Sequence, residues 1–99
     1  MEIKHEGRVM TVMLTGELDH HTCSKIRQKI DSCAESERPA LLCLDFSGVQ
    51  FMDSSGVGLV MGRYRQMSLI GGRVQVVNVP DNMERMFVMS GLPALGVMK

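Results

Sequence analysis

Residues 41–70 constrain the fold of this chain more than any other segment. They begin with a nearly continuous apolar run, residues 40–46, which predicts a β-strand covered on both faces. A short loop and the turn Asp53-Ser54-Ser55-Gly56 follow, and then a helical pattern that Gly71 and Gly72 bring to an end. A strand followed by a long helix is half of a strand–helix–strand crossover, so we expect a parallel sheet with helices packed on it.

Apolar periodicity predicts the elements before this segment. Residues 3–6 and 9–15 are strand candidates that pair as a hairpin around Gly7. Residues 17–22 are expected to be a loop, with Asp19 or Thr22 capping the helix that follows. One face of that helix is apolar and consists of Cys23, Ile26, Ile30, Cys33 and Ala34.

The same periodicity extends to the C-terminal half. The helix after Ser54 should bury one face while Arg63 lies elsewhere; that face comprises Val57, Val60, Met61, Tyr64, Met67 and Ser68. Residues 73–79 predict another buried strand. Asp81 and Glu84 have the spacing of a capping box for a third helix, whose face is Met83, Met86, Phe87 and Ser90. Residues 95–98 are expected to add a short edge strand.

The resulting order is β-β-α-β-α-β-α, with a possible eighth element at the end. It predicts a single α/β domain over residues 1–99, with a mixed, mostly parallel sheet packed with helices. The ten methionines indicate either an adaptable core or a surface that can repack around a partner.

The charge balance excludes two classes of partner. Eleven basic and eleven acidic residues cancel, so we expect neither a nucleic-acid footprint nor a basic membrane patch.

No apolar run is long enough to span a bilayer, and no basic region followed by a long apolar segment opens the chain. A cytoplasmic protein with reduced cysteines is expected, since Cys23, Cys33 and Cys43 contain no CxxC pair.

The turn Asp53-Ser54-Ser55-Gly56 is the main candidate site. It places two hydroxyls at a predicted helix start, where backbone N–H groups are unpaired and the local field favours negative charge. Helix capping by Asp or Ser explains one hydroxyl but leaves the adjacent serine without a role. A phosphate on a serine here would add a charge of roughly −1.5 to −2 and three acceptor oxygens. The residues alone leave both interpretations open.

Three other chemistries fit less well. A serine hydrolase would need G-x-S-x-G, but the first glycine is missing and His5, His20 and His21 all lie upstream. A metal site at His20, His21 and Cys23 lacks a second ligand cluster, so residues next to a helix cap are the better interpretation. No phosphate-binding loop or dinucleotide fingerprint is present.

Several motifs together carry a family resemblance. They are GELDHHT at residues 16–22, LDFSGV at 44–49, FMDSSGVG at 51–58, MGRY at 61–64 and MSGL at 89–92. In this combination and register they resemble the bacterial anti-sigma factor antagonists of the STAS family, over essentially the whole chain. The combination of GELDHHT, FMDSSG and GRY is most similar to the sporulation-type members.

The resemblance implies a regulatory binding protein that is not an enzyme and needs no cofactor. Its partner would be an anti-sigma factor that is also a serine kinase with an ATP site. The unphosphorylated form would bind this kinase and free the sigma factor. Phosphorylation of the serine after the Asp, here Ser54 with Ser55 as the alternative, would end binding, and a PP2C-type phosphatase would reverse it. The implied partner-binding residues are Asp19, His20, Asp53, Ser54, Ser55 and Gly56.

The resemblance leaves two alternative functions open. Some family members bind purine nucleotides, so the protein could be a nucleotide- or ligand-sensing module in which Ser54 only caps a helix. It could also be an antagonist in a general-stress pathway and not in sporulation. We expect the free protein to be monomeric.

Overall fold

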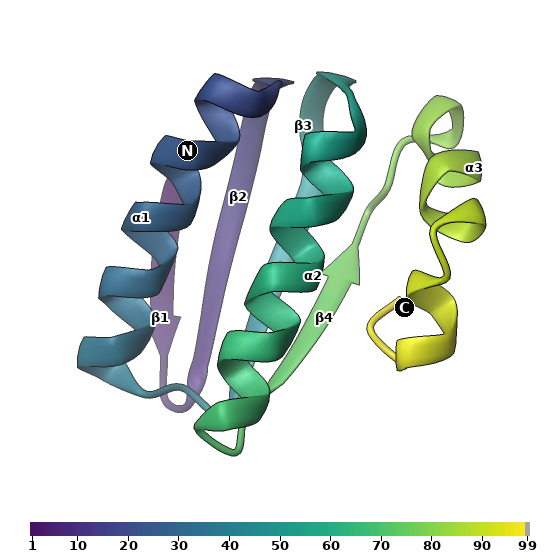
Figure 1. Ribbon diagram of the computed structural model, residues 1–99. Helices are drawn as coiled ribbons and strands as arrows, with labels where there is room; N and C mark the ends of the chain where they lie inside the picture. Colours follow the sequence, from purple (N-terminus) through teal and green to yellow (C-terminus); the bar gives the residue numbers. More distant parts are fainter. Residues whose placement is uncertain (99) are drawn as a thin grey trace.

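A four-stranded mixed sheet in the order β1-β2-β3-β4 forms the centre of the computed structural model, which describes residues 1–98 (Figure 1). The strands are β1 (Glu2–Glu6), β2 (Val9–Leu18), β3 (Leu41–Met52) and β4 (Arg73–Val77). β1 and β2 are an antiparallel hairpin, whereas β2–β3 and β3–β4 are parallel pairs. The predicted hairpin, the order of the first seven elements and the parallel crossovers are confirmed.

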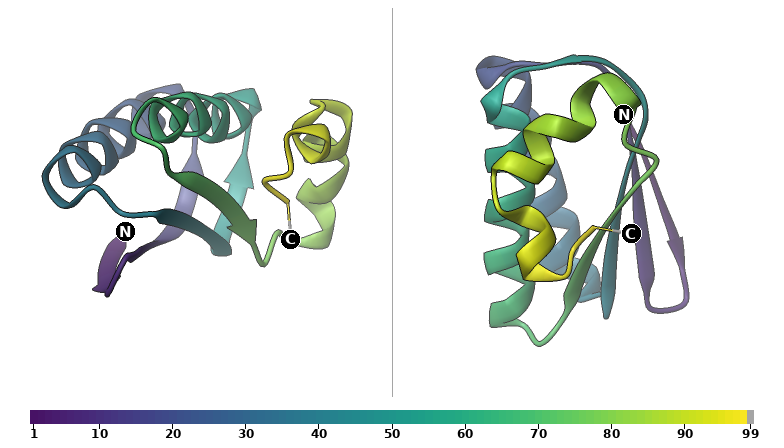
Figure 2. Two further views of the ribbon diagram at one scale, coloured as in Figure 1. Left: turned by 90° about the horizontal axis from the view of Figure 1, so that it is seen from below. Right: turned by 90° about the vertical axis from the view of Figure 1, so that its right-hand side faces the viewer.

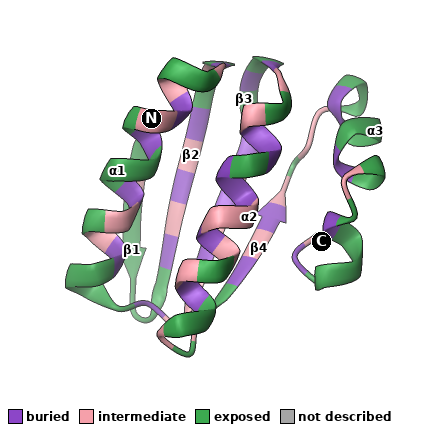
Figure 3. Ribbon diagram, in the orientation of Figure 1, coloured by how far each residue is buried: buried purple, intermediate pink, exposed green. Residues whose placement is uncertain are grey.

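Helices α1 (His20–Glu37) and α2 (Ser54–Leu69) cover one face of this sheet (Figure 2). α3 (Asp81–Met89) and a 3-10 helix, η1 (Leu92–Leu95), lie beside α2 at the β4 edge (Figure 1). Alternate strand residues point into the core, where Phe46 of β3 meets Phe87 of α3 edge-to-face at 5.2 Å between ring centroids. The buried residues of α1 and α2, purple in Figure 3, face the sheet and close the core on that side.

The prediction that the β3 strand is covered on both faces was wrong. Leu42, Leu44 and Phe46 are buried under the helices, but Leu41, Cys43 and Asp45 are only half-buried on the other face. The strand order moves in one direction from β2 to β4, and crossovers between parallel strands are right-handed. Both helices are therefore placed on the same face, and the neighbouring strands alone shield the opposite one.

Two segments predicted as loops belong to strands. β3 continues through residues 47–52, and β2 continues to Leu18, so that Asp19 alone separates β2 from α1. The β2–β3 ladder carries register shifts between Met13 and Thr15 and between Gly16 and Glu17. Gly48 allows the close approach of the two strands at this irregularity, because a Cβ there would lie 2.9 Å from the Leu14 carbonyl oxygen.

The buried face of α2 also differs from the prediction. Arg63, expected outside the apolar face, is buried, whereas Met61 and Tyr64 are half-buried and Ser68 is exposed. Arg63 Nε lies 2.8 Å from Asp31 Oδ1 of α1, although the N–H is not aligned for a hydrogen bond, so the contact is an ion pair. The helix is rotated toward α1 because it packs against that neighbour as well as against the sheet.

The C-terminal region departs from the expected caps and strand. α3 has Pro80 at its N-cap and no side-chain capping bond, so the predicted Asp81–Glu84 capping box does not form. The expected edge strand at residues 95–98 is replaced by η1 and one isolated bridge between Val76 and Met98. Pro93, near the start of η1, has no N–H to donate to a sheet, which favours the tight helical turn.

Among residues 1–98, no helix combines the length and apolar character that crossing a membrane requires.

Candidate functional site

Two helices begin side by side at the carboxyl end of the parallel strands (Figure 1). Leu18 and Met52 pair in the β2–β3 register, so Asp19 and Asp53, the residues that follow them, leave the sheet as neighbours. The Asp53 N–H donates to the Leu18 carbonyl oxygen at 3.3 Å, which joins the two turns. Both turns follow predicted strands, from which the sequence predicts that they share one face of the fold, and the structure confirms this.

Each of these aspartates caps the helix that follows it. Asp19 Oδ1 accepts from the Thr22 N–H at 2.8 Å, and Asp53 Oδ1 accepts from the Ser55 N–H at 2.8 Å. The hydrogen bond from the Thr22 backbone holds the pKa of the Asp19 carboxyl below its usual value. Capping is therefore done by the acids, and neither serine hydroxyl is needed for it.

The two adjacent serines face different surfaces. Ser54 is exposed and lines a groove of about 570 Å³ between α2 and α3. This α2–α3 groove is lined by Ser54, Val57, Asn82, Arg85, Met86, Met89 and Ser90. Ser55 is half-buried and lines a smaller α1–α2 cavity of about 260 Å³, together with His20, Cys23, Ser24, Arg27, Gly58 and Leu59. Of the two hydroxyls, Ser54 is the one open to solvent and to a large partner.

Cys23 lies beneath the two acidic turns. Burial raises the pKa of its thiol to about 11, and the charges of Asp53 and Asp19 act in the same direction. The thiol is therefore protonated at neutral pH and is a poor nucleophile or metal ligand. No cluster of three metal-ligating side chains occurs in the part of the chain that the structure describes.

Gly56 is required by the close packing of the serine turn on the sheet. It is buried, and a Cβ at this position would overlap the Sδ and Cγ atoms of Met52, the last residue of β3. His20, by contrast, is exposed at the start of α1. Of the six predicted partner-binding residues, Gly56 alone has no surface to offer a partner.

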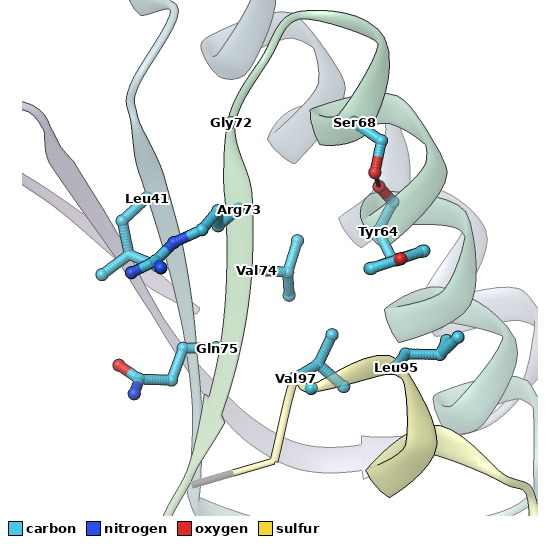
Figure 4. Close-up of a pocket in the computed structure, with 10 residues that line it drawn as sticks. Leu41, Tyr64, Ser68, Gly72, Arg73, Val74, Gln75, Leu95 and Val97 are labelled. Atoms are coloured by element: carbon cyan, nitrogen blue, oxygen red, sulfur yellow. Dashed lines mark hydrogen bonds between the residues drawn. The ribbon is translucent and has the colours of Figure 1, made fainter.

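A separate cavity of about 450 Å³ lies between α2, β4 and the C-terminal segment (Figure 4). Tyr64 and Ser68 of α2 border it on one side, and Val74 and Val97 point into it, while Arg73 and Gln75 point away. Tyr64 is ten residues beyond Ser54, or about 15 Å along the helix axis. This cavity does not share its lining with the serine turn.

Sequence reasoning missed the α3 side of the site. Met86 was assigned to a buried face, but it is 37% exposed and lines the α2–α3 groove with Met89, which is 72% exposed. Asn82 and Arg85 were given no role. Their spacing of three residues put them on one side of α3, but nothing in the sequence indicated that this side faces Ser54.

Comparison with known proteins identifies a family and several relatives of this chain. The family model described as "STAS domain" matches residues 1–96. Among curated proteins, an anti-sigma F factor antagonist of Paenibacillus polymyxa is 38% identical over 92 residues, which are 93% of this chain and 79% of the relative. One from Lysinibacillus sphaericus is 40% identical over 83 residues, which are 84% of this chain and 71% of that protein.

Two solved structures are similar over nearly all of the chain. The unphosphorylated form of the anti-sigma factor antagonist SpoIIAA matches with a TM-score of 0.87 and 34% identity, covering 99% of this chain and 84% of that one. The phosphorylated form of the Bacillus cell fate determinant SpoIIAA matches with a TM-score of 0.79 and 35% identity, covering 99% and 87%. The sheet order and the paired helix starts are consistent with the fold of these two structures. Because the family model covers residues 1–96, the chain belongs to the STAS domain family.

Proposed function

We propose that this protein is an anti-sigma factor antagonist of the SpoIIAA type, controlled by phosphorylation of Ser54. In its unphosphorylated form it binds an anti-sigma factor that is also a serine kinase, and the sigma factor is released. Phosphorylation of Ser54 ends this binding, and a PP2C-type phosphatase restores the hydroxyl. The protein acts in the cytoplasm as a regulator of transcription, not as an enzyme.

One observation carries this proposal: Ser54 is exposed at a helix start whose cap is supplied by another residue. Asp53 accepts the capping hydrogen bond, and within residues 1–98 the Ser54 hydroxyl takes no part in a hydrogen bond. The fold does not depend on this hydroxyl, so it is free for modification. The positive end of the α2 dipole tolerates an added phosphate, so the fold should survive phosphorylation.

A docked partner would not tolerate the same phosphate. The dianion would stand beside Asp53 and close to Asp19, and burying it in an interface is costly unless cations pair with it. A loss of about 3 kcal/mol in binding free energy lowers affinity by roughly a hundredfold. That is sufficient for a two-state switch.

The phosphoryl transfer itself requires only a positioned hydroxyl. A bond forms between Ser54 Oγ and the γ-phosphorus of ATP, the bond to the bridging oxygen breaks, and ADP leaves, while the hydroxyl proton passes to a base on the kinase. The names of the curated relatives, at 38% and 40% identity, favour a sporulation pathway over a general-stress pathway.

The test is a phosphorylation assay with an anti-sigma factor kinase from the same organism and ATP, with the modified residue read by mass spectrometry. We expect one phosphate on Ser54, none on Ser54→Ala, and unchanged labelling of the matched control Ser55→Ala. Complex formation, followed by titration, should be lost after phosphorylation. Phosphate on Ser55 alone would move the switch to the other hydroxyl, and no phosphate on either would reject it.

A charge mimic separates electrostatics from the chemistry of transfer. Ser54→Asp adds one negative charge at the rim of the α2–α3 groove, and we expect it to keep the fold and weaken kinase binding about tenfold or more. Unchanged affinity in a calorimetric titration would contradict the electrostatic account.

A second candidate is a ligand-sensing module, for which the cavity of Figure 4 offers a site of about 450 Å³. Its lining is mixed: Tyr64 and Ser68 supply hydroxyl groups, and aliphatic side chains such as Val74 supply apolar surface. It contains no phosphate-binding loop, so it favours a nucleotide less than a small aromatic compound that carries polar groups. Binding of GTP or ATP to the protein without any kinase, weakened by Tyr64→Ala but not by Ser54→Ala, would support this candidate over the switch.

A further inference from the structure

The α2–α3 groove brings the proposed acceptor opposite the polar side of α3. Ser54 lies at the start of α2, and Asn82 and Arg85 lie in the first turns of α3, at the same end of the molecule (Figure 1). All three line one groove of about 570 Å³. A phosphate on Ser54 would project from the rim of this groove toward side chains that donate hydrogen bonds.

Arg85 is a cation without an acidic partner. Its Nε contacts Sδ of Met89 on the next turn of α3 at 3.5 Å, and its guanidinium takes part in no ion pair among residues 1–98. Arg63, in contrast, is held by Asp31 and buried. The exposed guanidinium of Arg85 can therefore turn into the groove at the loss of only a weak contact with sulfur.

The charges around Ser54 are otherwise mostly acidic. Asp53 precedes it, and Asp19 lies on the neighbouring turn, which is joined to this one by the hydrogen bond from the Asp53 N–H to the Leu18 carbonyl oxygen. A phosphate dianion beside these two carboxylates would be disfavoured by like-charge repulsion without a nearby cation. Among the residues that line the groove, Arg85 is the cation.

We propose that the phosphate on Ser54 is bound within the same molecule by Arg85, with the Asn82 amide as a second donor. The planar guanidinium donates two parallel N–H groups to two phosphate oxygens, which is the strongest pairing a side chain offers to phosphate. The paired phosphate and guanidinium then lie in the groove that Met86 and Met89 also line. The inference rests on the proposed function, because it concerns the phosphorylated state of the same residue.

This contact assigns a second effect to the modification. Phosphorylation adds charge and also draws the Arg85 side chain to the Ser54 side of the groove, so a partner that packs against the methionines meets an altered surface. A phosphatase must in turn displace Arg85 before it reaches the phosphorus. The contact with Arg85 therefore stabilises the phosphorylated protein, in addition to the electrostatic repulsion between the phosphate and the partner.

The test places phosphoserine at position 54 during translation, so that it does not depend on any kinase. The pKa of the phosphate is then measured by 31P NMR titration in the full chain. We expect Arg85→Gln to raise this pKa by roughly 0.5–1 unit relative to the otherwise unaltered protein, because the cation that favours the dianion is gone. Arg85→Lys should restore part of the shift.

Arg65→Gln is the matched control, because Arg65 is exposed on α2 and lies outside the groove. Equal pKa values in the Arg85→Gln and Arg65→Gln proteins would overturn the inference. Circular dichroism of both variants verifies folding. The kinase assay fails or succeeds independently of this titration, so loss of the proposed function and loss of the Arg85 contact are told apart.

Discussion

The starts of α1 and α2 have the same backbone arrangement but carry different side chains. Both follow parallel neighbouring strands, both begin after one aspartate, and both aspartates accept a backbone hydrogen bond at 2.8 Å. After Asp19 come two histidines and Thr22, whereas after Asp53 come two serines and Gly56. The first start carries large exposed rings, and the second carries small hydroxyls on a backbone packed closely against Met52.

The difference shows that a helix cap is not in itself a functional site. Both turns have an acid, free backbone N–H groups and a favourable dipole. What distinguishes the α2 start is an accessible hydroxyl that faces a groove with a free cation, formed by a helix far along the chain. The variants below test first the contact between the two helices, then the α2 start and then the α1 start.

The largest effect is expected where the two helices are joined. Asp31→Ala leaves the Arg63 guanidinium, which is 94% buried, without its counter-charge, and should lower the free energy of unfolding by about 3 kcal/mol. Arg63→Met leaves Asp31 a quarter exposed to water and should cost only about 1 kcal/mol. Urea denaturation measures both, and equal losses would mean that Arg63 finds another partner.

The second effect concerns the glycines of the α2 start. Gly56→Ala forces a methyl group into Met52 and should lower the free energy of unfolding by about 2 kcal/mol. Gly58→Ala is the matched control, because a Cβ there has nothing within 4 Å, and it should raise that free energy by about 0.5 kcal/mol. Thermal unfolding that ranks the two variants in the opposite order would contradict the close packing of this turn.

The smallest effect is a pH dependence at the α1 cap. The pKa of Asp19 is lower in the folded protein than its ordinary value of 3.8, so its ionised form stabilises the fold. This contribution is complete above the unfolded-state pKa and is lost as the pH falls through the lower folded-state pKa. Asp19→Ala should be less stable than the parent at pH 7, and the difference should vanish below that range. A difference that does not shrink as the pH falls below 3.8 in acid titrations of both proteins would exclude the ionised cap as its source.

Much of the site could be predicted because its chemistry is local. Asp53, Ser54 and Ser55 are consecutive, and a turn that follows a strand and starts a helix can be recognised from residue types and spacing. The pairing of the Asp19 turn with the serine turn also followed from local evidence, since both leave the ends of predicted strands. Arg85 could not be found in this way, because its position opposite Ser54 depends on how α3 docks.

The buried faces of the helices were predicted less well where two neighbours compete. The α1 pattern was largely confirmed, with Cys23, Ile26, Ile30 and Ala34 buried and Cys33 half-buried. Arg63 was misplaced because periodicity treats a charged residue as solvent-facing, whereas Asp31 on another helix neutralises it. An ion pair between helices has no signature in either helix alone.

The amino-acid sequence by itself determined the order of the first seven elements, the parallel crossovers, the capped starts of α1 and α2, and the family. These depend on short-range periodicity, backbone freedom and contiguous motifs, which one segment carries complete. Tertiary structure alone decided which face of the sheet is covered, that Arg63 is buried, and that Ser54 and Ser55 face different surfaces. These depend on the relative placement of segments that are distant in the chain, and that placement follows from the handedness of the crossovers and from packing against neighbours.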